Sequence, residues 1–252
     1  MKTAFITGAS SGIGMACARR FARDGYRLIL NARRRDSLQQ LADQLKQTYG
    51  TETLLLVFDV RDREEARRQI DSLPVEWQEI DVLINNAGLA LGLEKEYEGD
   101  FADWDTMIDT NIKALLSITR FVVPGMVARG KGHIINIGSV AGDAAYPNGA
   151  VYCATKAAVK TLSDGLRMDL AHTPLRVTNI KPGLVETNFS VVRFHGDKDR
   201  ADNVYKGIQP LTGDDIAETA FFAASAPAHV QIAEVLVLAT HQASGTVVYR
   251  EQ

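Results

Sequence analysis

The stretch Thr7-Gly8-Ala9-Ser10-Ser11-Gly12-Ile13-Gly14 decides how the rest of the chain is interpreted. It follows a short apolar run, Ala4–Thr7, and opens a helical pattern, Ile13–Arg23, so its glycines lie at a strand-to-helix turn. Glycine has no Cβ and lets the backbone turn tightly and approach a ligand closely. The free N–H groups that begin a helix attract anions, so the turn predicts a phosphate site.

Two other interpretations of this stretch remain open. The first is a glycine-rich turn that binds nothing, since the GxxxGxG spacing differs from the common GxGxxG pattern. The second is a nucleophile elbow, because residues 8–12 also match G-x-S-x-G. That motif needs a sheet and an oxyanion loop before it, and only seven residues precede Gly8. The hydrolase interpretation is therefore disfavoured.

Apolar strands alternate with helices along the chain. The strands expected are Ala4–Thr7, Arg27–Leu30, Leu54–Phe58, Asp81–Ile84, His133–Ile137, Arg176–Ile180 and Glu234–Leu238. The helices expected are Ile13–Arg23, Ser37–Tyr49, Arg63–Ser72, Trp104–Val123 and Val151–His172. This order predicts an α/β fold, a doubly wound parallel sheet with helices on both faces and ligands at the carboxyl ends of the strands.

Length and composition fit one globular domain. The chain has 252 residues, 46% hydrophobic and 23% charged, with a net charge of −3, which excludes disordered classes and argues against a general nucleic-acid binder. Cys17 and Cys153 have no metal-binding or disulfide spacing, and the five histidines show none either, so no metal is expected. We find no signal peptide and no continuous apolar run of about 18 residues, so we expect a cytoplasmic protein without membrane contact.

The segment 188–211 interrupts the alternation. It mixes charges with apolar residues, has no clean period and is too long for an ordinary connection. We expect either a lid over a site or a disordered segment.

Three consecutive arginines end the second strand, in Asn31-Ala32-Arg33-Arg34-Arg35. In a dinucleotide-binding fold this point meets the adenosine ribose, where an acid selects NAD and arginine accommodates the 2′-phosphate of NADP. Cations are unfavourable at a helix start unless an anion is bound. We therefore expect Arg33 and Arg34 to bind a phosphate through charge-assisted hydrogen bonds.

Tyr152 and Lys156 form a second candidate site. At i and i+4 they share one helical face, and a nearby ammonium lowers the pKa of a phenol toward neutral pH. Such a pair is common on helix surfaces. Its position thirteen residues after Ser139, which ends the fifth expected strand, favours a role in proton transfer.

Together these residues resemble the short-chain dehydrogenase/reductase family, from residue 3 to about 187. The resemblance is carried by Thr7-Gly8-x-x-x-Gly12-x-Gly14, Asn85-Asn86-Ala87-Gly88, Asn111, Ser139, Tyr152-x-x-x-Lys156 and Pro182-Gly183. It implies one Rossmann-type domain over residues 1–252 with seven parallel strands in the order 3-2-1-4-5-6-7. It also implies hydride transfer between a nicotinamide and an alcohol or carbonyl carbon.

The resemblance also implies roles for single residues. Tyr152 would exchange a proton with the substrate oxygen, and Lys156 would lower the pKa of Tyr152 and hold the nicotinamide ribose. Ser139 would hydrogen-bond the substrate oxygen, and Asn111 would bind a water of the proton relay. The implied cofactor residues are Gly8, Ser10, Ser11, Gly12, Ile13, Gly14, Arg33, Arg34, Asp59, Val60, Asn86, Ala87, Gly88, Tyr152, Lys156, Pro182, Gly183, Val185 and Thr187.

The family pattern agrees with NADP as the cofactor. Ala32 stands where NAD-preferring members carry an acid. Ser11 stands where some NADP-using members carry a base, so the 2′-phosphate would depend on Arg33 and Arg34.

The 188–211 segment and the C-terminal strand are similar to one branch of the family, the NADP-dependent 3-hydroxy acid dehydrogenases, also called serine or allo-threonine dehydrogenases. This implies a small substrate such as serine, allo-threonine or 3-hydroxypropionate, with Arg193 as the candidate for its carboxylate. The alternatives are a reductase of other carbonyls or 3-oxoacyl groups, a non-enzymatic dinucleotide-binding regulator, and a solvated Arg193.

Family members commonly form homotetramers through long helices. Ala154, Ala157 and Ala158 would allow close packing between subunits, or they could pack only within the subunit. The arginines near residues 19–35 lack interleaved aromatics, so we expect no nucleic-acid partner.

Overall fold

A computed structural model describes residues 1–251 and contains one seven-stranded parallel sheet in the order β3-β2-β1-β4-β5-β6-β7. The predicted fold class and strand order are confirmed. The strands are β1 Thr3–Ile6, β2 Arg27–Ala32, β3 Thr53–Val57, β4 Val82–Asn85, β5 His133–Ile137, β6 Arg176–Pro182 and β7 Glu234–Val237.

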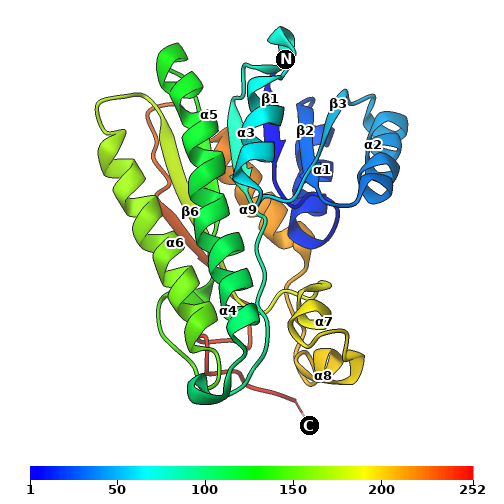
Figure 1. Ribbon diagram of the computed structural model, residues 1–252, viewed down its shortest axis with the longest axis vertical. Coiled ribbons are helices and arrows are strands. Elements are labelled where there is room, and N and C mark those ends of the chain that lie inside the picture. Colours follow the sequence, from blue (N-terminus) through cyan, green and yellow to red (C-terminus); the bar gives the residue numbers. More distant parts are fainter. Residues whose placement is uncertain (252) are drawn as a thin grey trace.

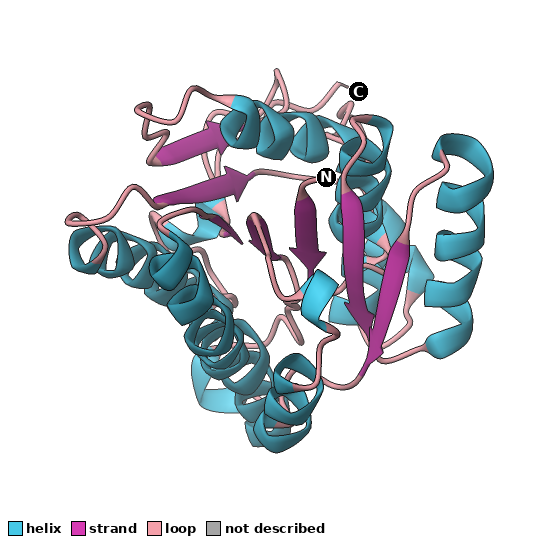
Figure 2. Ribbon diagram, turned by 90° about the horizontal axis from the view of Figure 1, so that it is seen from above, coloured by secondary structure: helices cyan, strands magenta, loops and turns pink. Residues whose placement is uncertain are grey.

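Helices cover both faces of the twisted sheet (Figure 2). Figure 1 shows α3, α5 and α6 on one face, and the short α7 and α8 next to each other at one end of the molecule. The α-helices are α1 Gly12–Arg23, α2 Arg35–Tyr49, α3 Arg63–Asp71, α4 Phe101–Ile108, α5 Leu115–Arg129, α6 Ala150–Asp169, α7 Phe189–Arg193, α8 Lys198–Asn203 and α9 Gly213–Ser225.

Each central strand contributes to two hydrophobic cores. Ala4 and Ile6 of β1 face one core, shared with α1, α2 and α9, whereas Phe5 faces the other, shared with α3 and α5. All three side chains have no exposed surface. Apolar residues on both faces of a strand require covering on both sides, and this explains the continuous hydrophobic runs in the sequence.

Three segments differ from the sequence prediction. The helix expected over Trp104–Val123 is longer and is interrupted by a π-helical stretch, Asp109–Ala114, between α4 and α5. Helix α9 was not predicted, although Thr212 and Asp215 form a capping box at its start, a pattern visible in sequence. The segment 188–211 is ordered and contains α7 and α8.

The helical stretch Phe101–Arg129 is long and apolar enough to cross a membrane by length and composition, which a search for continuous apolar runs did not reveal. Part of its apolar surface lies in the core of the domain. Ile118 and Met126 of α5 are buried against the sheet. Core helices often have this composition, so the stretch is weak evidence for a membrane span.

His133, the first residue of β5, makes folding sensitive to acid. Its ring is buried, and its Nε2 lies 2.7 Å from Thr178 Oγ1. Burial, with a smaller contribution from Arg176, lowers the His133 pKa to about 3, against about 6.5 in an unfolded chain. The unfolded state therefore binds more protons between these values, and stability must fall as pH decreases through this window.

The free energy of unfolding should decrease less steeply from pH 6 to pH 4 in His133→Gln than in the parent protein. One histidine contributes at most about 1.4 kcal/mol per pH unit to this slope. Urea titrations at several pH values measure this slope. The matched control is His172→Gln on the exposed surface, which should leave the slope unchanged. Identical slopes for all three proteins would contradict the assignment.

Candidate active site

A cleft of about 540 Å³ runs along the carboxyl ends of the strands and beneath the 188–211 segment. It brings together most of the residues singled out from the sequence. Those lining it are Gly8, Ser10, Ser11, Gly12, Ile13, Arg33, Asp59, Val60, Asn86, Ala87, Gly88, Ser139, Tyr152, Lys156, Pro182, Gly183, Val185, Thr187 and Arg193. Gly14, Arg34 and Asn111 are not among the lining residues.

The glycine turn depends on contacts that only glycine permits. Gly8 and Gly12 have φ values of +66° and +52°, in the left-handed region. A Cβ on Gly14 would overlap the carbonyl oxygen of Gly8 and the side-chain amide of Asn86. Gly14 therefore shapes the turn from behind, and Gly8 and Gly12 face the cleft.

Asn86, just after β4, holds this turn in place. Its Nδ2 donates to the carbonyl oxygens of Thr7 at 2.9 Å and Gly8 at 3.2 Å. The Thr7 hydroxyl oxygen accepts from the backbone N–H groups of Asn86 and Ala87, both at 3.1 Å. These bonds leave the N-terminus of α1, which has no acidic residue in its first turn, facing the cleft. Such a helix start suits a phosphate.

Ser139, Tyr152 and Lys156 meet at the centre of the cleft. Ser139 caps a short 3₁₀ turn by accepting from the Ala141 N–H at 3.1 Å, and its side chain hydrogen-bonds Tyr152. The Lys156 Nζ donates to the carbonyl oxygen of Ile137 at 2.9 Å and lies 5.9 Å from the centroid of the Tyr152 ring. The predicted triad is therefore assembled by the end of β5 and the first turns of α6.

Burial is the largest cause of the pKa shifts of Tyr152 and Lys156. It raises the Tyr152 pKa above the ordinary phenol value, helped by Tyr146 and opposed by Ser139 and Arg193. It lowers the Lys156 pKa to about 8. Lys156 is not among the groups that shift the Tyr152 pKa in the protein by itself, and its Nζ donates to the Ile137 carbonyl. That Lys156 lowers the Tyr152 pKa stays a prediction.

Asn111 lies behind the cleft, in the π-helical stretch. Its side chain donates to the Leu89 carbonyl at 2.8 Å and to Thr155 Oγ1 at 3.0 Å, and accepts from the Leu89 N–H at 2.9 Å. Thr155 in turn donates to the Tyr152 carbonyl at 2.7 Å. The side chain thus connects the loop after β4 to α6.

The arginines after β2 divide between two positions. Arg33 lines the cleft, and its Nη1 lies 3.9 Å from Asp59 Oδ2. Asp59 also accepts from Arg61, at 2.7 Å for its closest bond, and these arginines lower the Asp59 pKa despite its partial burial. Arg34 is exposed at the N-cap of α2, just outside the lining. Arg61 was not predicted from the sequence and adds a second cation beside Arg33.

The 188–211 segment closes over the other end of the cleft. Arg193 Nε donates to the Gly92 carbonyl at 3.1 Å, and the Gly92 N–H donates to the Arg193 carbonyl at 3.0 Å. His195 Nε2 lies 3.0 Å from Asp103 Oδ2. The guanidinium of Arg193 is half-buried, and within residues 1–251 it forms no ion pair with an acidic side chain. A half-buried cation facing a cleft favours an anion as its partner.

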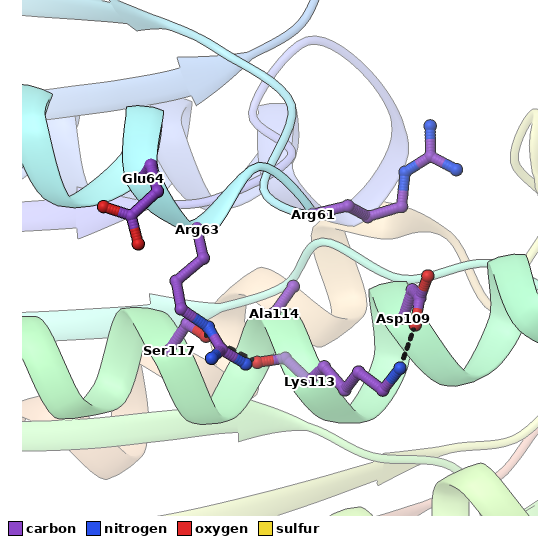
Figure 3. Close-up of a pocket in the computed structure, with 7 residues that line it drawn as sticks. All are labelled: Arg61, Arg63, Glu64, Asp109, Lys113, Ala114 and Ser117. Carbon is purple, nitrogen blue, oxygen red and sulfur yellow. Dashed lines mark hydrogen bonds and ion pairs between the residues drawn. The ribbon is translucent and has the colours of Figure 1, made fainter.

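A smaller groove lies between α3 and the helix that contains Asn111 (Figure 3). In this groove Lys113 pairs with Asp109 at 2.7 Å, and Arg63 donates to Ser117 Oγ at 3.2 Å. Figure 3 shows Arg61 pointing away from the other side chains. No group of three metal-binding side chains occurs among residues 1–251. The large cleft is therefore the candidate active site.

The family model for short chain dehydrogenases matches residues 2–197, and the chain belongs to this family, as the sequence motifs predicted.

Within the family, the chain is similar to proteins named for hydroxy acid oxidation. It is 47% identical over 252 residues to the NADP-dependent 3-hydroxy acid dehydrogenase of Schizosaccharomyces pombe, covering 100% of this chain and 97% of that protein. The closed form of serine dehydrogenase complexed with NADP+ is 44% identical, with a TM-score of 0.92, covering 99% and 100% of the two chains. The crystal structure of serine dehydrogenase from Escherichia coli is 42% identical, with a TM-score of 0.83, and the match covers 96% of this chain and 99% of that chain.

We expect Tyr152→Phe to lower kcat by about 10²–10⁴-fold, the usual contribution of general acid–base catalysis, because the variant keeps the ring and loses the proton donor. Steady-state turnover measures the loss. NADP+ binding, followed by fluorescence titration, serves as the control and should survive. Turnover within a few-fold of the parent protein would show that another group transfers the proton.

Proposed function

We propose that this protein transfers a hydride between NADP(H) and the C3 carbon of a small 3-hydroxy acid, such as serine, allo-threonine or 3-hydroxypropionate. The observation that carries the proposal is the meeting of Ser139, Tyr152 and Lys156 in one cleft with Arg193, which has no acidic partner among residues 1–251. The first three groups handle a proton, and the fourth supplies a cation for a carboxylate.

The reaction divides between cofactor and protein. NADP+, when bound, accepts the hydride, and NADPH supplies it in the reverse direction. Tyr152 takes the hydroxyl proton during oxidation and returns it during reduction. Ser139 hydrogen-bonds the same substrate oxygen and stabilises the phenolate of Tyr152. Lys156 holds the nicotinamide ribose, and Asn111 supports the proton relay by fixing the loop and helix around it.

The residues around the cleft fit NADP. The glycine turn and the start of α1 would hold the pyrophosphate, and Asp59 with Val60 would contact the adenine. Arg33 and Arg34 would bind the 2′-phosphate. The remaining cofactor residues proposed, along both sides of the cleft, are Asn86, Ala87, Gly88, Pro182, Gly183, Val185 and Thr187.

Arg193 favours an acid as substrate over other carbonyl compounds. A broad carbonyl or 3-oxoacyl reductase would have no need of a cation at the closed end of the cleft. A regulator that only binds the dinucleotide would have no need of the proton-transfer residues. The observations therefore support a hydroxy acid dehydrogenase over both alternatives.

We further propose a cytoplasmic homotetramer with no nucleic-acid or membrane partner. Two exposed apolar surfaces support the assembly. Leu116 is 44% exposed at the start of α5, Met168 is 75% exposed at the end of α6, and Ala154 is exposed near the start of α6. Phe222 of α9 is 63% exposed, and Leu236 of β7 is 47% exposed. Two distinct self-complementary surfaces are what a closed tetramer needs.

The tetramer predicts a light-scattering mass of about four times the chain mass of 27.6 kDa at micromolar concentration. Met168→Glu should shift the mass toward that of a dimer, because a charge placed in a buried apolar interface is costly. A mass near 27.6 kDa for the parent protein would exclude the assembly.

Cofactor choice is tested at Arg33. The parent protein should prefer NADP(H) over NAD(H) at least about tenfold, since a hydrogen bond to a charged group contributes roughly 1.5–3 kcal/mol. Arg33→Ala with Arg34→Ala should abolish the preference, with the larger share from Arg33 because it lines the cleft. Arg35→Ala, on the exposed start of α2, is the matched control. Equal use of both cofactors by the parent would contradict the proposal.

The proposed carboxylate site is tested with two substrates that differ in charge. These are 3-hydroxypropionate, which carries a carboxylate, and its uncharged methyl ester, methyl 3-hydroxypropionate. Arg193→Ala should reduce kcat/KM for the acid by about 30-fold or more, since a desolvated charged contact contributes about 2–5 kcal/mol. The ester should change much less. Arg200→Ala is the control, because Arg200 lies in the same segment and stacks on Phe194 but does not itself line the cleft. Equal losses for acid and ester would show that Arg193 only supports the lid.

A further inference from the structure

Tyr146 lies at the same end of the cleft as Arg193 and has no role in the site described so far. It follows the Ser139 turn and precedes α6, and its side chain is half-buried against the cleft. Its hydroxyl oxygen accepts from Arg193 Nη1 at 2.9 Å. The two residues are 47 positions apart in sequence and are brought together by the closed 188–211 segment.

Gly149 leaves the space that the Tyr146 ring occupies. Gly149 begins the turn into α6, and its N–H donates to the Tyr146 carbonyl at 3.1 Å. A Cβ on Gly149 would overlap the Tyr146 ring. Any other residue at position 149 would therefore push the ring away from Arg193.

The guanidinium of Arg193 is fixed on three sides. Its Nε donates to the Gly92 carbonyl, and its Nη1 donates to Tyr146. Its Cζ lies 5.5 Å from the Tyr146 ring centroid and 5.7 Å from that of Tyr152. Within residues 1–251 no hydrogen bond occupies Nη2. The Arg193 guanidinium therefore has N–H donors left that can bind an anion beside Tyr152.

The Tyr146 hydroxyl can supply one donor more. Its oxygen already accepts from Arg193, and its own hydrogen meets only the Cys153 thiol, a weak acceptor that a carboxylate can replace. Burial raises the pKa of Tyr146 above the ordinary phenol value, which keeps the hydroxyl protonated at neutral pH. Asp59 is the one acidic residue that lines the described cleft, and it lies beside Arg33 and Arg61 at the adenine end. Glu94 and Asp103 lie beside Gly92 but bond to the Leu93 N–H and to His195, and among residues 1–251 no carboxylate forms an ion pair with Arg193.

We propose that Tyr146 is a substrate-binding residue whose hydroxyl joins Arg193 in holding the carboxylate of the 3-hydroxy acid, an inference that rests on the proposed function. The spacing suits such an acid. Its carboxylate carbon lies two bonds of about 1.5 Å from the carbon that exchanges the hydride. Donors immediately beside Tyr152 can therefore hold the carboxylate while Tyr152 reaches the C3 oxygen. An acid with a longer chain would place its carboxylate beyond them.

The test measures oxidation of 3-hydroxypropionate and of methyl 3-hydroxypropionate by the NADP+-bound enzyme. Tyr146→Phe should raise KM for the acid about tenfold or more, as expected for a lost hydrogen bond to a charged group, and leave its kcat within about twofold. KM and kcat for the ester should both stay within about twofold. In the Arg193→Ala background, Tyr146→Phe should have a smaller effect on the acid, because the two donors act on one group.

The control is Tyr205→Phe, which removes a hydroxyl bonded to Ser190 and to the Val185 carbonyl inside the same segment. It should affect acid and ester alike. Two results would overturn the role of Tyr146: unchanged KM for the acid in Tyr146→Phe, or equal losses for acid and ester. A parent enzyme that does not prefer the acid over the ester would overturn the proposed function itself, and this comparison involves no variant of Tyr146.

Discussion

The close contact between the glycine turn and the end of β4 leaves no room for one additional carbon atom, and the rest of the site depends on it. Gly14 rests on the Gly8 carbonyl and on the Asn86 amide, and that amide bonds to two carbonyl oxygens of the turn. The contact fixes the direction in which α1 leaves the sheet. It also fixes where the loop after β4 begins, and that loop supplies Gly88 and the Leu89 contacts of Asn111. The glycine turn and the loop after β4, which lie on two sides of the cleft, are thereby both positioned by the contact of Gly14 with Gly8 and Asn86.

The proton-transfer centre and the closed end of the cleft obtain their properties from burial more than from pairing. Tyr152 and Lys156 are both desolvated, which disfavours the charged form of each. Arg193 favours the phenolate through its charge, and Ser139 does the same through a hydrogen bond. A substrate carboxylate that engages Arg193 would weaken this support, so binding of the acid and protonation of Tyr152 are linked through one guanidinium.

Sequence patterns predicted the sheet, the glycine turn and the meeting of Ser139, Tyr152 and Lys156 in one cleft, because each is encoded locally by period, turn chemistry or spacing. The π-helical stretch around Asn111 was missed, since one extra residue in a helical turn leaves the apolar pattern almost unchanged. The contact of Tyr146 with Arg193 could not be predicted, because it depends on how an irregular segment returns to the cleft. The burial of Tyr152 could not be predicted for a related reason: helical spacing reports proximity to Lys156 and contains no information about burial.

The segment over the cleft leaves and rejoins the domain at one point. Val185 and Leu211 form a parallel bridge, the Glu186 N–H donates to the Leu211 carbonyl at 2.8 Å, and the Leu211 N–H donates to the Leu184 carbonyl at 2.9 Å. The intervening residues are thus a closed excursion from a rigid base. Their length and composition can diverge during evolution without strain on the sheet or the dinucleotide cradle. The same domain can in this way acquire new substrates when only the segment 188–211 is exchanged, because the two ends of that segment already lie side by side.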